Sequence, residues 1–222
     1  ADNCESAEQI VRQIADVEID DKISFVIKKT EEIMEDSEYQ GVRLSLDAYL
    51  DKTRIPLKID ISTGDVITPC EISFSYQLMF ENRTIPLLAY PPETVLAEKL
   101  ETILSRGEAN TRLRDFYDVY ILQREDFVVT PDALCHALLA TCRKRGHEDL
   151  LHTYASILDR VRQSDTMRTQ WMKYQSDFDY AAGITWDTVL DTVETLCMKT
   201  LDDHAFGDEL PQEESQFEMH LL

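Results

Sequence analysis

Residues 92–121 carry most of the side chains of this chain that could do chemistry. Lys99 and Arg106 lie seven residues apart, so on a helix they project from nearly the same side. Asp115 and Asp118 lie three residues apart and share a helix face in the same way. Ammonium and guanidinium groups bind phosphates, and paired carboxylates bind metal ions or take up protons. The segment therefore predicts a site for an anionic substrate.

The charge of this segment differs from that of the whole chain. The chain has 222 residues and a formal net charge of -21. An acidic surface repels phosphates, so broad binding of nucleic acid is not expected. Residues 99–114 carry two acidic and four basic residues, and we interpret the four as candidate substrate-binding residues at a local positive focus: Lys99, Arg106, Arg112 and Arg114.

Two amphipathic helices are expected to position these side chains. Pro92 suits the first turn of a helix, apolar residues then recur every three or four positions, and Gly107 suits the helix end. A second helix begins near Leu113, with Asn110 or Thr111 as its cap. Solvated charged faces on such a helix pair explain the same spacing without any site. Spacing alone leaves both interpretations open.

Alternation of apolar and polar residues predicts a sheet upstream of these helices. Residues 42–50 and 55–61 alternate and are separated by a short polar turn, which indicates a hairpin. Asp60 projects from its second strand, on the face opposite the isoleucines. Further strands are expected at 23–28, 71–79 and 84–90, and helices at 5–17, 30–41, 130–146, 149–163, 166–178 and 185–201.

Three other groups of residues are interpreted as structural. Cys135, His136, Cys142 and His147 fit no zinc pattern, and core thiols explain them better. The basic run 143–145 is expected to complement the dipole at the end of its helix. The aromatic residues between positions 154 and 180 are spaced as packing surfaces.

The motifs Ala-Glu-Lys, Arg-Gly, Asn-Thr-Arg and Asp-Phe-Tyr-Asp follow one another between Glu93 and Tyr120. In this order and spacing they resemble the signature of the AbiEii/AbiGii toxin family of nucleotidyltransferases, a branch of the polymerase-β-like superfamily. The resemblance extends more loosely upstream to about residue 40 and fades after about residue 125. It implies an α+β fold, in which the mixed or antiparallel sheet of a nucleotidyltransferase-like core is followed by a helical C-terminal part.

The resemblance also implies a division of the chain. Residues 1–90 would form a partial nucleotidyltransferase-like α/β core. Residues 91–201 would form a helical domain that carries the motif of Lys99, Asp115 and Asp118. Residues 202–222 contain seven acidic residues and no Lys or Arg, and we expect them to form an acidic mobile tail.

The resemblance assigns Mg²⁺ as the cofactor and gives roles to single residues. In the family, two aspartates follow a Gly-Gly or Gly-Ser turn, and a third metal-binding aspartate lies on a later strand. The sequence LKIDIS resembles that strand, so Asp60 is a candidate catalytic residue and metal ligand. Lys99 would neutralise triphosphate charge. Asp115 or Asp118 would position or deprotonate the acceptor as a catalytic carboxylate.

The chain departs from the family pattern before Asp60. No Gly-Gly or Gly-Ser turn followed by Asp-x-Asp precedes it, and the chain opens at Ala1, with Met34 as its first methionine. We therefore expect the chain to lack the N-terminal part of the metal site and to be inactive as it stands. The alternative is a non-catalytic module, derived from the same fold, that binds a nucleotide or a protein.

The predicted function is that of a Mg²⁺-dependent nucleotidyltransferase toxin. It would transfer a nucleotide from an NTP to an acceptor, with RNA such as a tRNA end as the candidate acceptor. The resemblance implies a toxin–antitoxin or abortive phage infection system, with a cognate antitoxin encoded nearby. No apolar run approaches the ~20 residues that span a bilayer, so no membrane partner is expected. Five scattered cysteines favour reduced thiols and a cytoplasmic location.

Overall fold

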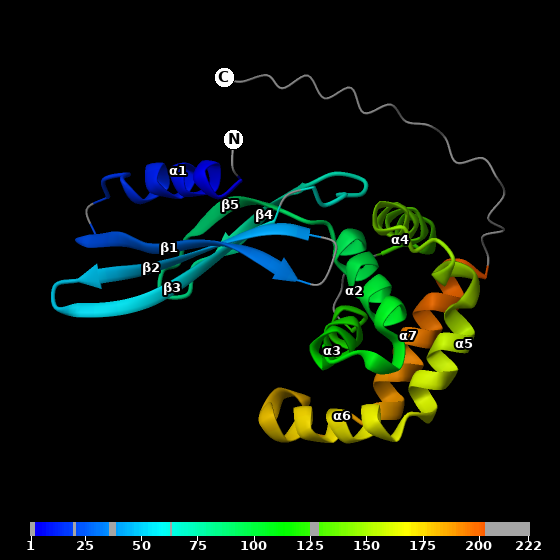
Figure 1. The fold of residues 1–222 in the computed structure, drawn as a ribbon. Coiled ribbons are helices and arrows are strands. Elements are labelled where there is room, and N and C mark those ends of the chain that lie inside the picture. Colours follow the sequence, from blue (N-terminus) through cyan, green and yellow to red (C-terminus); the bar gives the residue numbers. More distant parts are fainter. Residues whose placement is uncertain (1–2, 20, 36–38, 63, 125–128, 203–222) are drawn as a thin grey trace. The chain divides into compact units, whose positions relative to one another are not determined.

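The computed structural model describes residues 3–19, 21–35, 39–62, 64–124 and 129–202 (Figure 1). The chain divides into two compact units, Ala1–Val66 and Ile67–Leu222. Both units contain helices and antiparallel strands, so the α+β fold expected from the sequence is confirmed. Each unit is described by itself below.

The first unit is a three-stranded antiparallel sheet with one helix packed on it. The strands occur in the order β1 (Ile23–Glu35), β2 (Tyr39–Leu50) and β3 (Thr53–Ser62), and the helix is α1 (Asn3–Ala15). Alternation along β2 places Val42, Leu44 and Leu46 on one face of the sheet. These side chains are buried together with Ala7 and Val11 of α1. The core of this unit therefore lies between α1 and the central strand.

Residues 30–35 form a strand, so the short helix expected over 30–41 is wrong in the part that the structure describes. Strand β1 continues to Glu35 and pairs with the start of β2, where Glu31 faces Arg43 and Ile33 faces Gly41. The helical preference of acidic residues is weak, and tertiary pairing overrides it. The other upstream predictions are confirmed, and β3 is an edge strand, as Pro56 requires.

The second unit contains a hairpin and, among its described residues, six α-helices. Strands β4 (Ile72–Gln77) and β5 (Thr84–Ala89) pair antiparallel. Short 3-10 turns lie at Gly107–Ala109 and Asp179–Ala181. All six helices match segments expected from the sequence: α2 (Pro92–Arg106), α3 (Leu113–Leu122), α4 (Pro131–Arg145), α5 (Leu150–Gln163), α6 (Asp165–Asp177) and α7 (Trp186–Leu201).

Along the chain, the first compact unit ends at residue 66 and the second begins at residue 67. The sequence suggested a different kind of boundary, between a sheet and a helical part, after residue 90. Contacts of Thr94 hold the start of α2 to the chain before β4. Its hydroxyl accepts a hydrogen bond from the Thr68 N–H at 2.9 Å and donates one to the Thr68 carbonyl at 2.9 Å. The functional domains assigned to 1–90 and 91–201 stay predictions. The expected tail lies outside the described residues, apart from Asp202.

Helix α2 packs against α3 and α4 (Figure 1). Leu96, Leu100 and Ile103 are almost completely buried. They belong to one core with Phe116 of α3 and Trp186 of α7. The apolar stripe predicted for this helix is therefore the surface around which its neighbours pack.

One charged side chain also lies inside this core. Glu101 of α2 is 1% exposed, and its carboxylate pairs with the guanidinium of Arg145 at the end of α4. The second carboxylate oxygen lies 2.7 Å from Nδ1 of His147. A carboxylate is tolerated at such depth when it is paired. Arg145 therefore joins α4 to α2 by an ion pair. From the sequence, it was expected only to complement the dipole at the end of α4.

Arg145→Ala is expected to lower the free energy of unfolding by about 3 kcal/mol or more, because the buried Glu101 carboxylate loses its main partner. Arg143 provides the matched control, since it lies on the same helix and pairs with exposed Glu148 at 2.9 Å. Arg143→Ala is expected to cost less than about 1 kcal/mol. Urea unfolding of both variants measures the difference. Equal losses would show that the buried pair stabilises the unit no more than a surface pair does.

Candidate functional site

The structure brings Lys99 of α2 together with Asp115 and Asp118 of α3. The Lys99 Nζ lies 3.0 Å from Asp115 Oδ1 and 2.7 Å from Asp118 Oδ2. The exposed fractions of the three side chains are 21%, 16% and 22%, respectively. The cluster thus lies at the margin of the core, where charges are only partly solvated but remain accessible to a substrate.

The charges in this cluster stabilise one another. Burial lowers the pKa of Lys99, but the hydrogen bonds and charges of Asp118 and Asp115 outweigh it, so the pKa of Lys99 is raised above its ordinary 10.5. Arg114 adds a longer contact, with its Nε 3.7 Å from Asp118 Oδ2. Lys99 is therefore protonated at neutral pH.

The other two predicted arginines lie at the end of α2 and just before α3. Arg106 is seven residues beyond Lys99, which is about 10 Å along a helix. Arg112 flanks the start of α3 and makes no side-chain cap there. Asn110 Oδ1 accepts a hydrogen bond from the Arg112 N–H at 2.7 Å. Asn110 therefore orders the connection before α3, and the prediction that Asn110 or Thr111 caps this helix is wrong.

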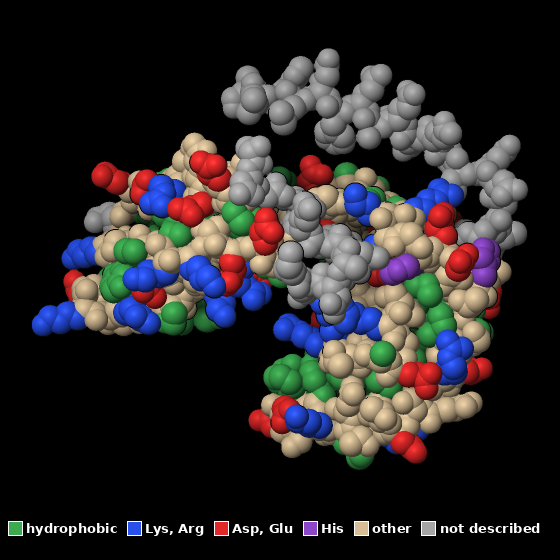
Figure 2. Space-filling model, in the orientation of Figure 1, with side chains coloured by type: hydrophobic (Ala, Val, Ile, Leu, Met, Phe, Trp, Pro, Cys, Tyr) green, Lys and Arg blue, Asp and Glu red, His purple; other side chains and the backbone are tan. Residues whose placement is uncertain are grey.

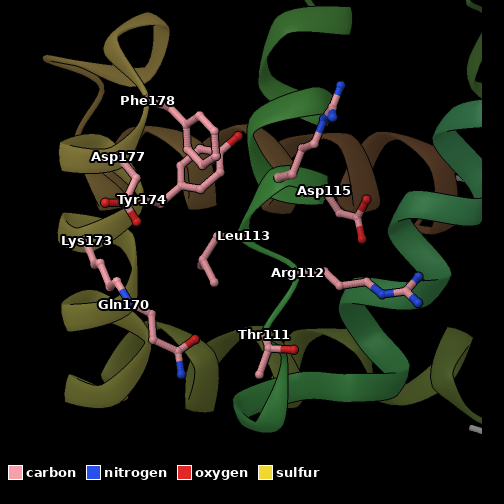
Figure 3. A pocket seen from close by; sticks show the side chains of 10 residues that line it. Thr111, Arg112, Leu113, Asp115, Gln170, Lys173, Tyr174, Asp177 and Phe178 are labelled. Atoms are coloured by element: carbon pink, nitrogen blue, oxygen red, sulfur yellow. The ribbon is translucent and has the colours of Figure 1, made fainter. Parts of the chain in front are cut away.

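A pocket of about 550 Å³ lies between the start of α3 and α6 (Figure 3). It is lined by residues of the segments 111–115 and 170–178, which include Arg112, Arg114 and Asp115. Figure 3 shows Tyr174 and Phe178 extending toward the first segment, whereas Asp115 extends away from α6. Nothing local in the sequence indicates this pocket, because the aromatic residues of α6 have the spacing of a packing surface and no motif pairs them with α3.

Asp60 belongs to the other compact unit, where it pairs with Arg43 across the strands. Arg43 donates from Nε to Asp60 Oδ1 and from Nη2 to Asp60 Oδ2, each at 2.7 Å. The hydrogen bonds from Arg43 lower the pKa of Asp60, and burial opposes them slightly. The side chains are 35% and 51% exposed, so the pair contributes on the order of 1 kcal/mol or less.

The side chains described do not form a metal site by themselves. Within the described ranges, no group of three or more His, Cys, Asp or Glu is placed to hold a metal ion. Both oxygens of Asp60 already accept hydrogen bonds from Arg43. Cys135 and Cys142 are buried core thiols, as expected, and burial raises the pKa of Cys142 to about 12.

Lys99→Met is expected to lower the free energy of unfolding by about 2 kcal/mol at pH 7, because it removes a charged hydrogen-bond donor and leaves two carboxylates side by side. The loss should shrink as the pH rises from 7 through about 11, because the folded-state pKa of Lys99 is raised above 10.5 and the wild type then loses the same positive charge. Urea unfolding at both pH values measures this, with Lys144→Met at an exposed position as the control. A loss independent of pH would contradict the ion cluster.

A family model described as the nucleotidyl transferase AbiEii toxin of type IV toxin–antitoxin systems matches residues 4–192. The match spans Asp60 in the first unit and the Lys99 cluster in the second. No curated protein and no solved structure matches the chain. In the part of the chain that is described, no helix is both long and apolar enough to cross a membrane. Since the family model covers most of its length, the chain belongs to the family of AbiEii nucleotidyl transferase toxins.

Proposed function

We propose that this toxin transfers a nucleotidyl group from an NTP to a hydroxyl group of an acceptor, and that the acceptor is an RNA such as a tRNA end. The observation that carries the proposal is the Lys99 ammonium held between Asp115 and Asp118 in a chain of this family. The cluster combines a permanent positive charge for phosphates with carboxylates for a hydroxyl group. Both are needed at the same place for nucleotidyl transfer.

Lys99 is proposed to bind the phosphates of the NTP. An ammonium group has three N–H donors, and the two aspartates occupy two directions around Lys99. A phosphate oxygen can occupy the third, or displace one carboxylate. Residues 99–114 form a basic segment in an acidic chain, so a polyanion is attracted to this segment and repelled by most of the remaining surface. Arg112 and Arg114 extend this segment toward the pocket.

Asp115 and Asp118 are proposed to position the acceptor and take its proton. The hydroxyl oxygen forms a bond to the α-phosphorus, the bond to pyrophosphate breaks, and the proton passes to one carboxylate. A carboxylate has two oxygens and accepts several hydrogen bonds, so contact with Lys99 leaves capacity for a hydroxyl group. Lys99 keeps the carboxylates close to the phosphate-binding charge.

Asp60 and Mg²⁺ enter the proposal only through the family resemblance. Proteins usually bind Mg²⁺ through one or two carboxylates together with substrate phosphates, and Asp60 is a candidate for one of them. Its two oxygens would first have to leave Arg43. The roles of Lys99 and the α3 aspartates do not depend on this ligand.

The biological setting follows from the family in outline. A type IV toxin–antitoxin family implies an antitoxin partner. We add to the proposal that the antitoxin is encoded next to the toxin, that the pair limits phage infection, and that the toxin acts in the cytoplasm, where NTPs and reduced thiols are found. All five cysteines are free thiols, which supports a reducing compartment.

A non-catalytic module that binds nucleotides or a protein is the second candidate. It is favoured by the engagement of Asp60 with Arg43 and by the lack of a three-ligand group among residues 3–202 as far as they are described. Such a module would use Lys99 and the arginines for recognition alone. The two candidates differ in whether a carboxylate that takes a proton is required.

Growth of cells that express the protein from its natural coding region separates the two candidates. The wild type is expected to slow growth unless the neighbouring gene is co-expressed. Asp118→Asn and Asp60→Asn are expected to relieve the toxicity, since each removes a proposed catalytic carboxylate. Asp60→Asn is informative because its exposed ion pair contributes little to stability. Equal toxicity of all three proteins at equal expression would exclude transfer as the cause and favour the binding module.

A further inference from the structure

The pocket beside α3 has an aromatic wall that the proposed chemistry does not use. Tyr174 and Phe178 have ring centroids 4.8 Å apart, and Phe178 stacks on Tyr180 at 5.3 Å with an interplanar angle of 27°. The ring centroid of Tyr117 in α3 lies 4.8 Å from that of Tyr180. Phe178 is 41% exposed and Tyr180 is 50% exposed, so this wall presents ring surface to solvent. We call these four residues the aromatic wall, of which Tyr174 and Phe178 line the pocket.

Polar groups surround the aromatic wall. Lys173 and Arg114 line the same pocket, and both are exposed. Figure 2 shows hydrophobic side chains gathered beside Lys and Arg on this face, where Figure 1 draws α3 and the end of α6. Gln170 also lines the pocket, and its Oε1 is buried without a hydrogen-bond partner among the described residues. A buried oxygen without a hydrogen-bond donor lowers the stability of the protein, and a donor group of a ligand would remove this penalty.

The three features together match the chemistry of a nucleotide. Aromatic rings stack on bases of any sequence, and nearby cations attract the phosphates. A glutamine amide recognises the edge of a base, with its oxygen accepting a hydrogen bond from an exocyclic amino group. The volume of about 550 Å³ lies within the range of small-ligand pockets. Asp115 borders this pocket and also contacts Lys99, so a nucleotide here would lie next to the proposed reaction site.

We propose that this pocket binds one nucleotide by its base, between the aromatic wall and Gln170, and favours adenine or cytosine over uracil. Adenine and cytosine carry the exocyclic amino group that donates to Gln170 Oε1, and uracil does not. The inference rests on the proposed function for the role of this nucleotide, which is either that of the acceptor strand or that of the free NTP. Both sources present the same base and phosphate chemistry.

Equilibrium binding without turnover tests the inference on the 222-residue chain. The probes are fluorescein-labelled hexamers of adenylate and of uridylate, followed by anisotropy, and free ATP and UTP, followed by calorimetry. Phe178→Ala is expected to weaken adenine binding about fivefold or more, the smallest effect typical of one lost stack. Met172→Ala is the matched control, because Met172 is an exposed apolar residue of α6, the helix that ends just before Phe178, and does not line the pocket. It should leave binding unchanged.

Two further variants identify the polar contacts. Gln170→Leu should abolish the preference for adenine over uracil while retaining the stacking contribution. Lys173→Ala should weaken all probes alike and reduce the salt dependence, since it removes a phosphate contact. Lys144→Ala, at an exposed position of α4, should do neither. Thermal unfolding of each variant establishes that it is folded.

The two probe types distinguish the source of the nucleotide. Weaker binding of the hexamer by Phe178→Ala assigns the pocket to an RNA strand, and weaker binding of ATP assigns it to the free nucleotide. Either result supports the inference. Equal binding by wild type and by folded Phe178→Ala and Gln170→Leu overturns it. Failure of the proposed transfer is seen separately, because the preference for adenine over uracil is measured as binding in the absence of turnover.

Discussion

The ammonium group of Lys99 holds two carboxylates of a neighbouring helix, and the candidate site depends on this ion cluster. Without the cation, Asp115 and Asp118 would repel each other at the margin of the core, where solvent screens charge poorly. With Lys99 in place, two carboxylates, which can accept protons, lie beside an ammonium group, which can bind phosphates. The same contacts join α2 to α3, so the cluster has a structural role in addition to the chemical role that we propose for it.

Helix α2 can position this cluster because its opposite side is anchored in the core by an ion pair. Glu101 lies two residues after Lys99, about 200° around the helix, and pairs with Arg145 inside the core. The apolar stripe of α2 packs on its neighbours between these two ion pairs. Because α2 makes ion pairs on both sides, the Lys99 ammonium is held in one position. Catalytic groups gain from this fixed placement, because no reorganisation is needed when a substrate binds.

The sequence predicted the parts of this structure that depend on local pattern. Helices α2 and α3 and the hairpin that carries Asp60 follow from the periodicity of their apolar residues. The strand at 30–35 was missed, because its pairing with β2 outweighs the local preference of acidic residues. Glu101 and Arg145 are 44 residues apart, and only the position of Glu101 on the buried side of α2 could have indicated a partner. The pocket wall formed by α6 has no local signal, since its aromatic spacing is that of a packing surface.

The central claim is that the Lys99 cluster performs nucleotidyl transfer. Its most direct test uses protein expressed from its natural coding region, total RNA, and each NTP labelled at the α-phosphate. The account predicts that the wild type attaches label to RNA, and that Asp115→Asn/Asp118→Asn binds the NTP but attaches none. If the double variant still binds the NTP, it is folded. The loss of labelling is then due to the loss of the proton acceptor. Labelling of RNA at the wild-type rate by the double variant would contradict the account.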